Sequence, residues 1–164
     1  MTYTTKVSDL LPIAIALHEG QMYSEGDSAE EYIQHVLRVV IGVEKYRRYF
    51  PKLDWDIIRS VAIMHDTMED CNITVADCLK YNLAPKAIEY LQVVTRNKDN
   101  ETYDVYIERV GQHLETILIK LADLQTNIEH SYQLGERGVS LRVRWEKAKQ
   151  YLINLMLQHH ADLS

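Results

Sequence analysis

Apolar residues recur along this chain three and four positions apart, and strictly alternating apolar and polar residues are scarce. The first spacing places apolar side chains on one face of a helix, whereas alternation is typical of a half-buried strand. Only three prolines and six glycines interrupt the pattern. The pattern predicts helices over residues 8–21, 28–49, 54–72, 74–81, 85–95, 102–112, 114–132 and 139–160. The predicted fold class is therefore all-α.

Residue types at the helix starts support three of these boundaries. Ser28 and Glu31 have the spacing of a capping box, in which two side chains bind free amides of the first helical turn. Thr74 can cap the short helix that follows it, and Pro85 suits the first turn of the next helix. We therefore place helix starts beside Ser28, Thr74 and Pro85.

No internal repeat, low-complexity segment or linker divides the chain, so we expect one domain over residues 1–164. The polar residues 96–101 are predicted to form a loop. Gly135 and Gly138 mark a second loop. The helix 139–160 beyond it is expected to pack on the rest of a helical bundle.

Composition narrows the location and the partners. Hydrophobic residues make up 46% of the chain, but no uninterrupted apolar run approaches the length of a membrane span. The N-terminus lacks the apolar segment of a signal peptide. Cys71 and Cys78 are too few for a disulfide framework and are expected to be thiols of a reducing compartment. The formal net charge of -6 argues against nucleic acid as the main partner. We expect a cytoplasmic protein with neither a membrane nor a nucleic-acid partner.

The predicted helix 54–72 ends in ionisable residues that directly follow an apolar stretch: His65, Asp66, Glu69 and Asp70. Isolated charges are costly to bury, so these residues suggest a compensating cation or a catalytic role. On one continuous helix, Glu69 would lie one turn beyond His65, and Asp70 one turn beyond Asp66. Imidazole together with carboxylate suits a divalent ion of the Mn, Fe or Zn type. The alternative is an amphipathic helix end with a solvated acidic turn.

Other predicted helices supply further candidates. Asp123 lies in an almost wholly apolar segment, and Asn127 follows one turn later on the same helix face. The neighbours of His35 on its predicted helix, Tyr32, Val36 and Val39, look core-facing. The ordinary alternatives are a buried aspartate satisfied by an amide or backbone group, and a core histidine. With His65 and Asp66, these residues make up a ligand set for one metal ion, although spacing alone does not show that they converge.

Four segments carry a more specific signal: His18-Glu-Gly-Gln21, Glu31-Tyr-Ile-Gln-His35, His65-Asp-Thr-Met-Glu-Asp70 with Asn72-Ile-Thr74, and Ile119-Lys-Leu-Ala-Asp123 with Asn127. Their order resembles that of the HD-domain metal-dependent phosphohydrolases. Within these, it is most similar to the hydrolase domains of RelA/SpoT-type proteins and the small alarmone hydrolases. That branch has a His-Asp-x-x-Glu-Asp run and a Lys-Leu-Ala-Asp run with Asn four residues on. The resemblance covers residues 10–130 and implies a compact helical HD domain.

Carried over by position, the resemblance implies a ligand set for one metal ion: His35, His65, Asp66 and Asp123. The ion is typically Mn²⁺ in this branch, with Fe²⁺, Zn²⁺ and Mg²⁺ as alternatives. Glu69 and Asp70 would position and activate the attacking water. Asn127 would support the site or contact the nucleotide.

The resemblance breaks at a basic pair of the Arg-Lys type, which in the family holds the guanosine and its phosphates. The matching positions here read Met22-Tyr23-Ser24. The nearest cations are Arg96, Lys98 and Lys120, which are candidates for binding phosphate. A solvated loop is the alternative for Arg96 and Lys98. Tyr23 is a candidate for stacking on the base, with ordinary packing as its alternative.

The resemblance thus implies hydrolysis of a phosphate or pyrophosphate ester of a small nucleotide. Removal of the 3′-pyrophosphate from (p)ppGpp ranks first, and a 5′-nucleotidase or deoxynucleotide triphosphohydrolase ranks second because the basic pair is missing. A non-catalytic module that binds a nucleotide is the alternative from another class. In the last helix, Leu152, Leu155 and Met156 suit either the core or a contact within a homo-oligomer.

Overall fold

The computed structural model describes residues 3–4, 6–23 and 29–163, and their regular structure is helical. In chain order the helices are α1 (Val7–Leu17), α2 (Tyr32–Glu44), α3 (Trp55–Met64), α4 (Thr67–Asp70), α5 (Val75–Lys80), α6 (Pro85–Val94), α7 (Tyr103–Val110), α8 (Leu114–Ser131) and α9 (Gly135–Leu163). Isolated bridges join Thr4 to Leu83 and Met22 to Glu31. The all-α prediction is confirmed.

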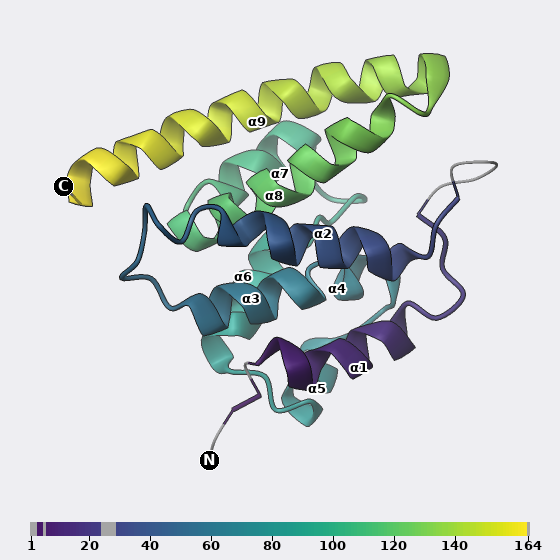
Figure 1. Ribbon diagram of the computed structural model, residues 1–164, viewed down its shortest axis with the longest axis vertical. Coiled ribbons are helices and arrows are strands. Elements are labelled where there is room, and N and C mark those ends of the chain that lie inside the picture. The colour runs from purple at the N-terminus through teal and green to yellow at the C-terminus, as the bar shows by residue number, and fades with distance from the viewer. Residues whose placement is uncertain (1–2, 5, 24–28, 164) are drawn as a thin grey trace.

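Helix α8 lies between two hydrophobic cores, and the long helix α9 runs along its outer side (Figure 1). Leu118 and Ile119 of α8 belong to the larger core, which α1, α2, α3 and α6 share. Leu121 and Leu124 belong to a smaller core with α7 and α9. Helix α8 is therefore apolar on both sides, as its sequence predicts, and Asp123 is 3% exposed within it. Among the described helices, none has the length and apolar character that crossing a membrane requires.

The predicted starts of α5 and α6 are confirmed, whereas that of α2 is wrong. Thr74 caps α5, and Pro85 occupies the first turn of α6. Helix α2 begins at Tyr32 instead of beside Ser28, which lies outside the described residues. The reason is a short backbone pairing before the helix, in which the Tyr32 amide donates to the Gln21 carbonyl at 2.9 Å. This pairing brings the segment 21–23 against the start of α2.

The predicted continuous helix 54–72 is also wrong, because the chain breaks between α3 and α4. Thr67 Oγ1 donates to the Met64 carbonyl at 2.8 Å, and His65 Nδ1 lies 2.8 Å from the Ala62 carbonyl oxygen. Side-chain donors thus occupy carbonyls that a continuing helix would use for its own amides. Asp66 has φ −100° and ψ −1° at the break. As a result, His65 and Asp66 lie at a bend, and the one-turn stacking expected for Glu69 and Asp70 does not apply.

The junction between α8 and α9 is tighter than the predicted glycine loop. Helix α9 already begins at Gly135, whose φ of 57° lies in the region that favours glycine. Gly138 lies within the first turns of α9, where a Cβ atom would overlap the Ser131 carbonyl oxygen. Close backbone approach therefore explains the glycine at position 138.

We expect Gly138→Ala to destabilise the protein by about 1–3 kcal/mol, because the added methyl group forces α8 and α9 apart. A glycine-to-alanine change in a relaxed helix would instead stabilise the protein slightly. Chemical denaturation monitored by circular dichroism measures the difference. Ser140→Ala, at an exposed position of the same helix, is the matched control. Equal stability of the two variants would contradict the tight junction.

Candidate metal centre

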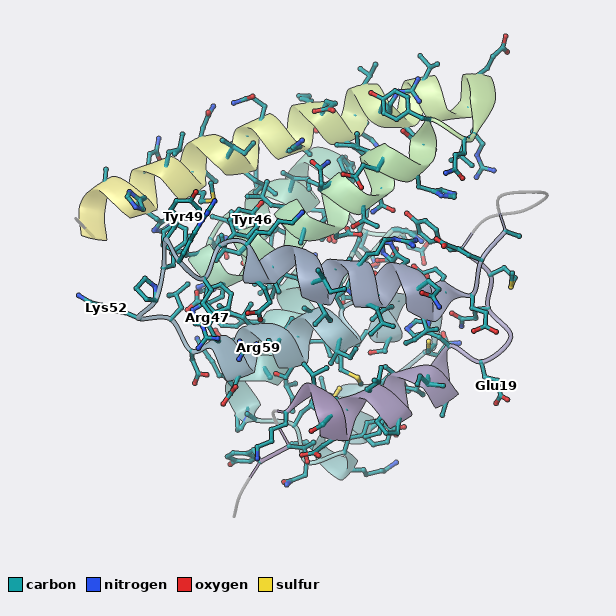
Figure 2. All side chains as sticks on the ribbon, viewed as in Figure 1. Glu19, Tyr46, Arg47, Tyr49, Lys52 and Arg59 are labelled. Carbon is teal, nitrogen blue, oxygen red and sulfur yellow. The ribbon has the colours of Figure 1, made fainter. Side chains whose placement is uncertain are left out.

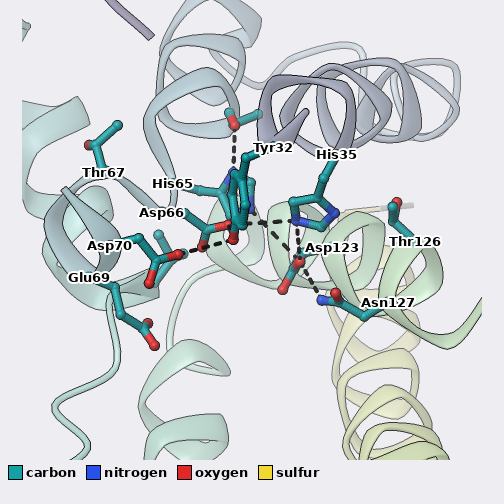
Figure 3. A network of polar contacts seen from close by, with 12 residues as sticks. Tyr32, His35, His65, Asp66, Thr67, Glu69, Asp70, Asp123, Thr126 and Asn127 are labelled. Atoms are coloured by element: carbon teal, nitrogen blue, oxygen red, sulfur yellow. Dashed lines mark hydrogen bonds and ion pairs between the residues drawn. The ribbon is translucent and has the colours of Figure 1, made fainter. Parts of the chain in front are cut away.

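Three of the predicted ligands converge where α2 meets the break between α3 and α4 (Figure 3). His35, His65 and Asp66 each offer one ligand atom, and these atoms lie within 4.8 Å of one another. Asp66 Oδ2 is 2.8 Å from His65 Nε2 and 3.5 Å from His35 Nε2. Asp123 of α8 adds its Oδ1 atom at 3.2 Å from His35 Nε2 and 3.8 Å from His65 Nε2. Three separate parts of the chain thus bring the four side chains together.

The hydrogen bonds of His65 determine which of its nitrogens faces this cluster. A carbonyl oxygen can only accept, so His65 Nδ1 carries the proton in its bond to Ala62. Nε2 is then the nitrogen that faces the carboxylates, with Asp66 Oδ2 at 2.8 Å, and it can bind a metal ion once its proton has left. Two imidazole nitrogens with two carboxylates make up a donor set that fits a divalent transition metal.

The charged groups of the cluster shift one another's pKa values. Burial opposes ionisation of Asp66, but His65 and His35 outweigh it and hold the pKa of Asp66 well below the ordinary 3.8. Burial likewise opposes ionisation of Asp123, whose pKa is held below 3.8 by Lys120 and by the histidines. In turn, burial lowers the pKa of His65, but Asp66 outweighs it and raises this pKa to about 9. Both carboxylates are therefore ionised, and a metal ion that binds them would displace the protons of the histidines.

Tyr32 connects the cluster to the predicted water-handling residue Asp70. The Tyr32 hydroxyl lies 2.8 Å from Asp66 Oδ2 and 3.0 Å from Asp70 Oδ2. Sequence reasoning treated Tyr32 as a core residue and missed this contact. Its position three residues before His35 was an available signal, because residues so spaced share a helix face.

Glu69 points away from the histidines toward the loop between α6 and α7. Its Oε1 atom lies 2.7 Å from Lys98 Nζ, and its Oε2 atom accepts a 3.3 Å hydrogen bond from the Arg96 amide. These three residues line a cavity of about 790 Å³. Arg109 fixes the loop by donating to the carbonyls of residues 92, 93 and 95 and to Glu101. The two predicted loop cations thus lie beside Glu69 at an anchored loop.

Asn127, Tyr23 and Lys120 surround Asp123. Asn127 Nδ2 donates to Asp123 Oδ1 at 2.6 Å, and Lys120 Nζ lies 2.6 Å from Asp123 Oδ2. The Tyr23 hydroxyl donates to Asn127 Oδ1, and its ring stacks on His35. The residues predicted to contact substrate are therefore divided between the vicinity of Asp123 and the loop beside Glu69.

The basic residues that follow α2 lie away from the metal centre. Figure 2 shows Arg47 and Lys52 at the opposite end of the molecule from Glu19. Glu19 follows His18, whose ring stacks on Tyr32 with centroids 4.9 Å apart. Arg47 and Lys52 therefore lie outside the candidate site.

Comparison with known proteins establishes the fold. No protein-family model matches the chain, and no curated protein matches it in sequence. Among solved structures, it is similar to a metazoan orthologue of SpoT that hydrolyses ppGpp and plays a role in starvation responses. The TM-score is 0.70 at 20% sequence identity, and the match covers 97% of this chain and 98% of the other. The helical fold implied by the resemblance to alarmone hydrolases is thus confirmed, and the likeness extends beyond residues 10–130 to α9.

Proposed function

We propose that this protein is a metal-dependent phosphohydrolase of small nucleotides, with the 3′-pyrophosphate of (p)ppGpp as the first-ranked leaving group. The observation that carries the proposal is the convergence of two histidines and two aspartates from three parts of the chain. A structural or purely interacting protein gives no reason for this buried donor set. The fold shared with a protein that hydrolyses ppGpp supports the ranking.

His35, His65, Asp66 and Asp123 would hold the metal ion. When bound there, a divalent ion lowers the pKa of a water molecule and polarises a phosphoryl oxygen. Asp70 would accept the proton of the attacking water, and its contact with Tyr32 holds it at a fixed position relative to Asp66. Glu69 would orient the water or the phosphate beside the loop cations. Mn²⁺ is the proposed ion, and a cytoplasmic location remains a prediction from the sequence.

The proposed phosphate contacts lie next to Glu69. Lys98 is 61% exposed at its side chain and can exchange Glu69 for a substrate phosphate at little cost. Arg96 has a buried Nε atom without a hydrogen-bond partner among the described residues. Lys120, which is 15% exposed, neutralises Asp123 and limits the negative charge that a phosphate meets. Asn127 and Tyr23 lie on the other side of Asp123.

One observation favours a second candidate, a 5′-nucleotidase or deoxynucleotide triphosphohydrolase. Where the resembling family carries its basic pair, this chain has Met22, which is 52% exposed, and the uncharged Tyr23. Arg38 lies 5.9 Å from the Tyr23 ring but is paired with Glu30. Among the described residues at this position, Met22 and Tyr23 therefore offer no cation to the phosphate groups of ppGpp, and the cation nearby, Arg38, is already paired.

A substrate panel tests the proposal. Purified protein with Mn²⁺ is incubated with ppGpp, deoxynucleoside triphosphates and nucleoside monophosphates, and released phosphate and pyrophosphate are measured. We expect pyrophosphate release from ppGpp that EDTA abolishes and Mn²⁺ restores, because the proposed reaction requires the metal ion that this ligand set would hold. Turnover of a deoxynucleotide without turnover of ppGpp would establish the second candidate. Tight Mn²⁺ and nucleotide binding without turnover of any substrate would instead indicate a non-catalytic module.

A further inference from the structure

The two histidines of the metal centre are held in different ways. His65 is fixed by the hydrogen bond from its Nδ1 atom to the Ala62 carbonyl. A metal-binding histidine almost always has such a bond, which fixes its tautomer and the orientation of its ring. His35 is 1% exposed, yet its Nδ1 atom has no hydrogen-bond partner among the described residues. Another interaction must therefore fix the plane of the His35 ring.

The ring of Tyr23 makes the contact suited to this purpose. It stacks on the His35 ring with centroids 4.3 Å apart and an interplanar angle of 11°. Tyr32 and His65 contact the His35 ring at steeper angles, 69° and 53°, with centroids 5.5 Å away in each case. A parallel flat ring restricts rotation of the imidazole out of its plane, which edge contacts do less well.

Tyr23 is itself held from several directions. Its amide donates to the Glu30 carbonyl at 2.9 Å, beside the bridge between Met22 and Glu31. Its hydroxyl donates to Asn127, and the His130 ring lies 4.5 Å from its own ring. The aromatic plane is therefore a fixed surface. Because His35 covers one face of this ring, that face is closed to a nucleotide base.

We infer that Tyr23 is a positioning residue, which fixes the plane of His35 by stacking and so preorganises the metal centre. This inference rests on the proposed function, since it assumes that His35 binds the metal ion. Tyr23, the uncharged residue where the resembling family has its basic pair, would then act on the metal site instead of on the substrate phosphates. The Tyr23 ring orients His35 as a metal ligand, while the substrate phosphates would be bound at the loop beside Glu69.

The Mn²⁺ affinity of the intact 164-residue chain tests the inference. Tyr23→Leu and Tyr23→Met keep an apolar side chain but remove the flat ring, whereas Tyr23→Phe keeps the ring and removes the hydroxyl. Tyr49→Leu, at the opposite end of the molecule (Figure 2), is the control. Electron paramagnetic resonance measures free Mn²⁺, and the visible spectrum of the Co²⁺-substituted protein reports the geometry of the ligands. Thermal unfolding in EDTA shows that each variant folds.

We expect Tyr23→Leu and Tyr23→Met to weaken Mn²⁺ binding by about 10–100-fold and to alter the Co²⁺ spectrum. Tyr23→Phe should bind Mn²⁺ within about threefold of the wild type and restore its spectrum, because the stack remains. Unchanged affinity in both non-aromatic variants would overturn the inference, and so would an equal loss in Tyr23→Phe. The proposed function survives both of these outcomes. Failure of the wild-type protein to bind Mn²⁺ would overturn the proposed function and the inference with it.

Discussion

Asp66→Asn is expected to abolish metal binding and, with it, the hydrolysis of any phosphate ester. Asp66 Oδ2 is the oxygen atom that His65 and His35 share, at 2.8 and 3.5 Å from their Nε2 atoms. Asparagine has the same shape but no charge, and its amide oxygen binds a metal ion less strongly than a carboxylate oxygen does. The other ligands stay in place. A bound ion contributes several kcal/mol to the transition state, and each 1.4 kcal/mol is a factor of ten in rate. We therefore expect kcat/KM to fall by at least about a thousandfold.

Metal content after dialysis and phosphate release measure the two effects of Asp66→Asn separately. The control is Asp104→Asn on α7, where the carboxylate is 68% exposed and pairs with Lys147 at the surface. Circular dichroism in EDTA shows whether the helices remain. Full activity together with unchanged Mn²⁺ content in Asp66→Asn would contradict the whole assignment of the metal centre.

The sequence indicated the members of the candidate metal centre but not how they are held. Its helical periodicity placed His35, His65 and Asp123 on separate helices, and the resemblance supplied the reason to group them. The break at His65 and Asp66 was not predicted, because no proline or glycine marks it. It arises from side-chain hydrogen bonds to the carbonyls of Ala62 and Met64, which compete with the helix only when neighbouring elements hold these side chains in place.

The tyrosines of the site show a second limit of sequence reasoning. An aromatic residue beside a histidine is ordinarily core packing, and neither Tyr23 nor Tyr32 carries a charge that would indicate chemistry. Tyr32 belongs to the site because its hydroxyl lies between Asp66 and Asp70, which come from a different part of the chain. The backbone pairing before α2 holds Tyr23 in its place in the site. The contact of Tyr23 depends on tertiary structure alone, whereas the spacing of Tyr32 and His35 indicated a shared helix face but not the carboxylates that Tyr32 contacts.

Asp70→Asn is expected to reduce kcat by about 10²–10⁴-fold, which is the usual contribution of a general base. Burial and the charge of Asp66 raise the pKa of Asp70 above the ordinary 3.8, so its carboxylate accepts a proton more readily. In the wild type, kcat should rise with pH as Asp70 loses its proton, and this acidic limb should shift or disappear in the variant. Mn²⁺ affinity should stay close to that of the wild type, because Asp70 contacts the centre through Tyr32.

Glu69→Gln provides the comparison that separates the two neighbouring carboxylates. Glu69 binds Lys98 at 2.7 Å, so its replacement should change KM as well as kcat by releasing a loop cation. A pH profile of kcat and a Mn²⁺ titration for both variants, with Asp104→Asn again as the control, distinguish the roles. If Asp70→Asn lost Mn²⁺ as Asp66→Asn is expected to, Asp70 would belong to the ligands. If it kept the wild-type kcat and its acidic limb, proton transfer would have to be assigned to Glu69 instead.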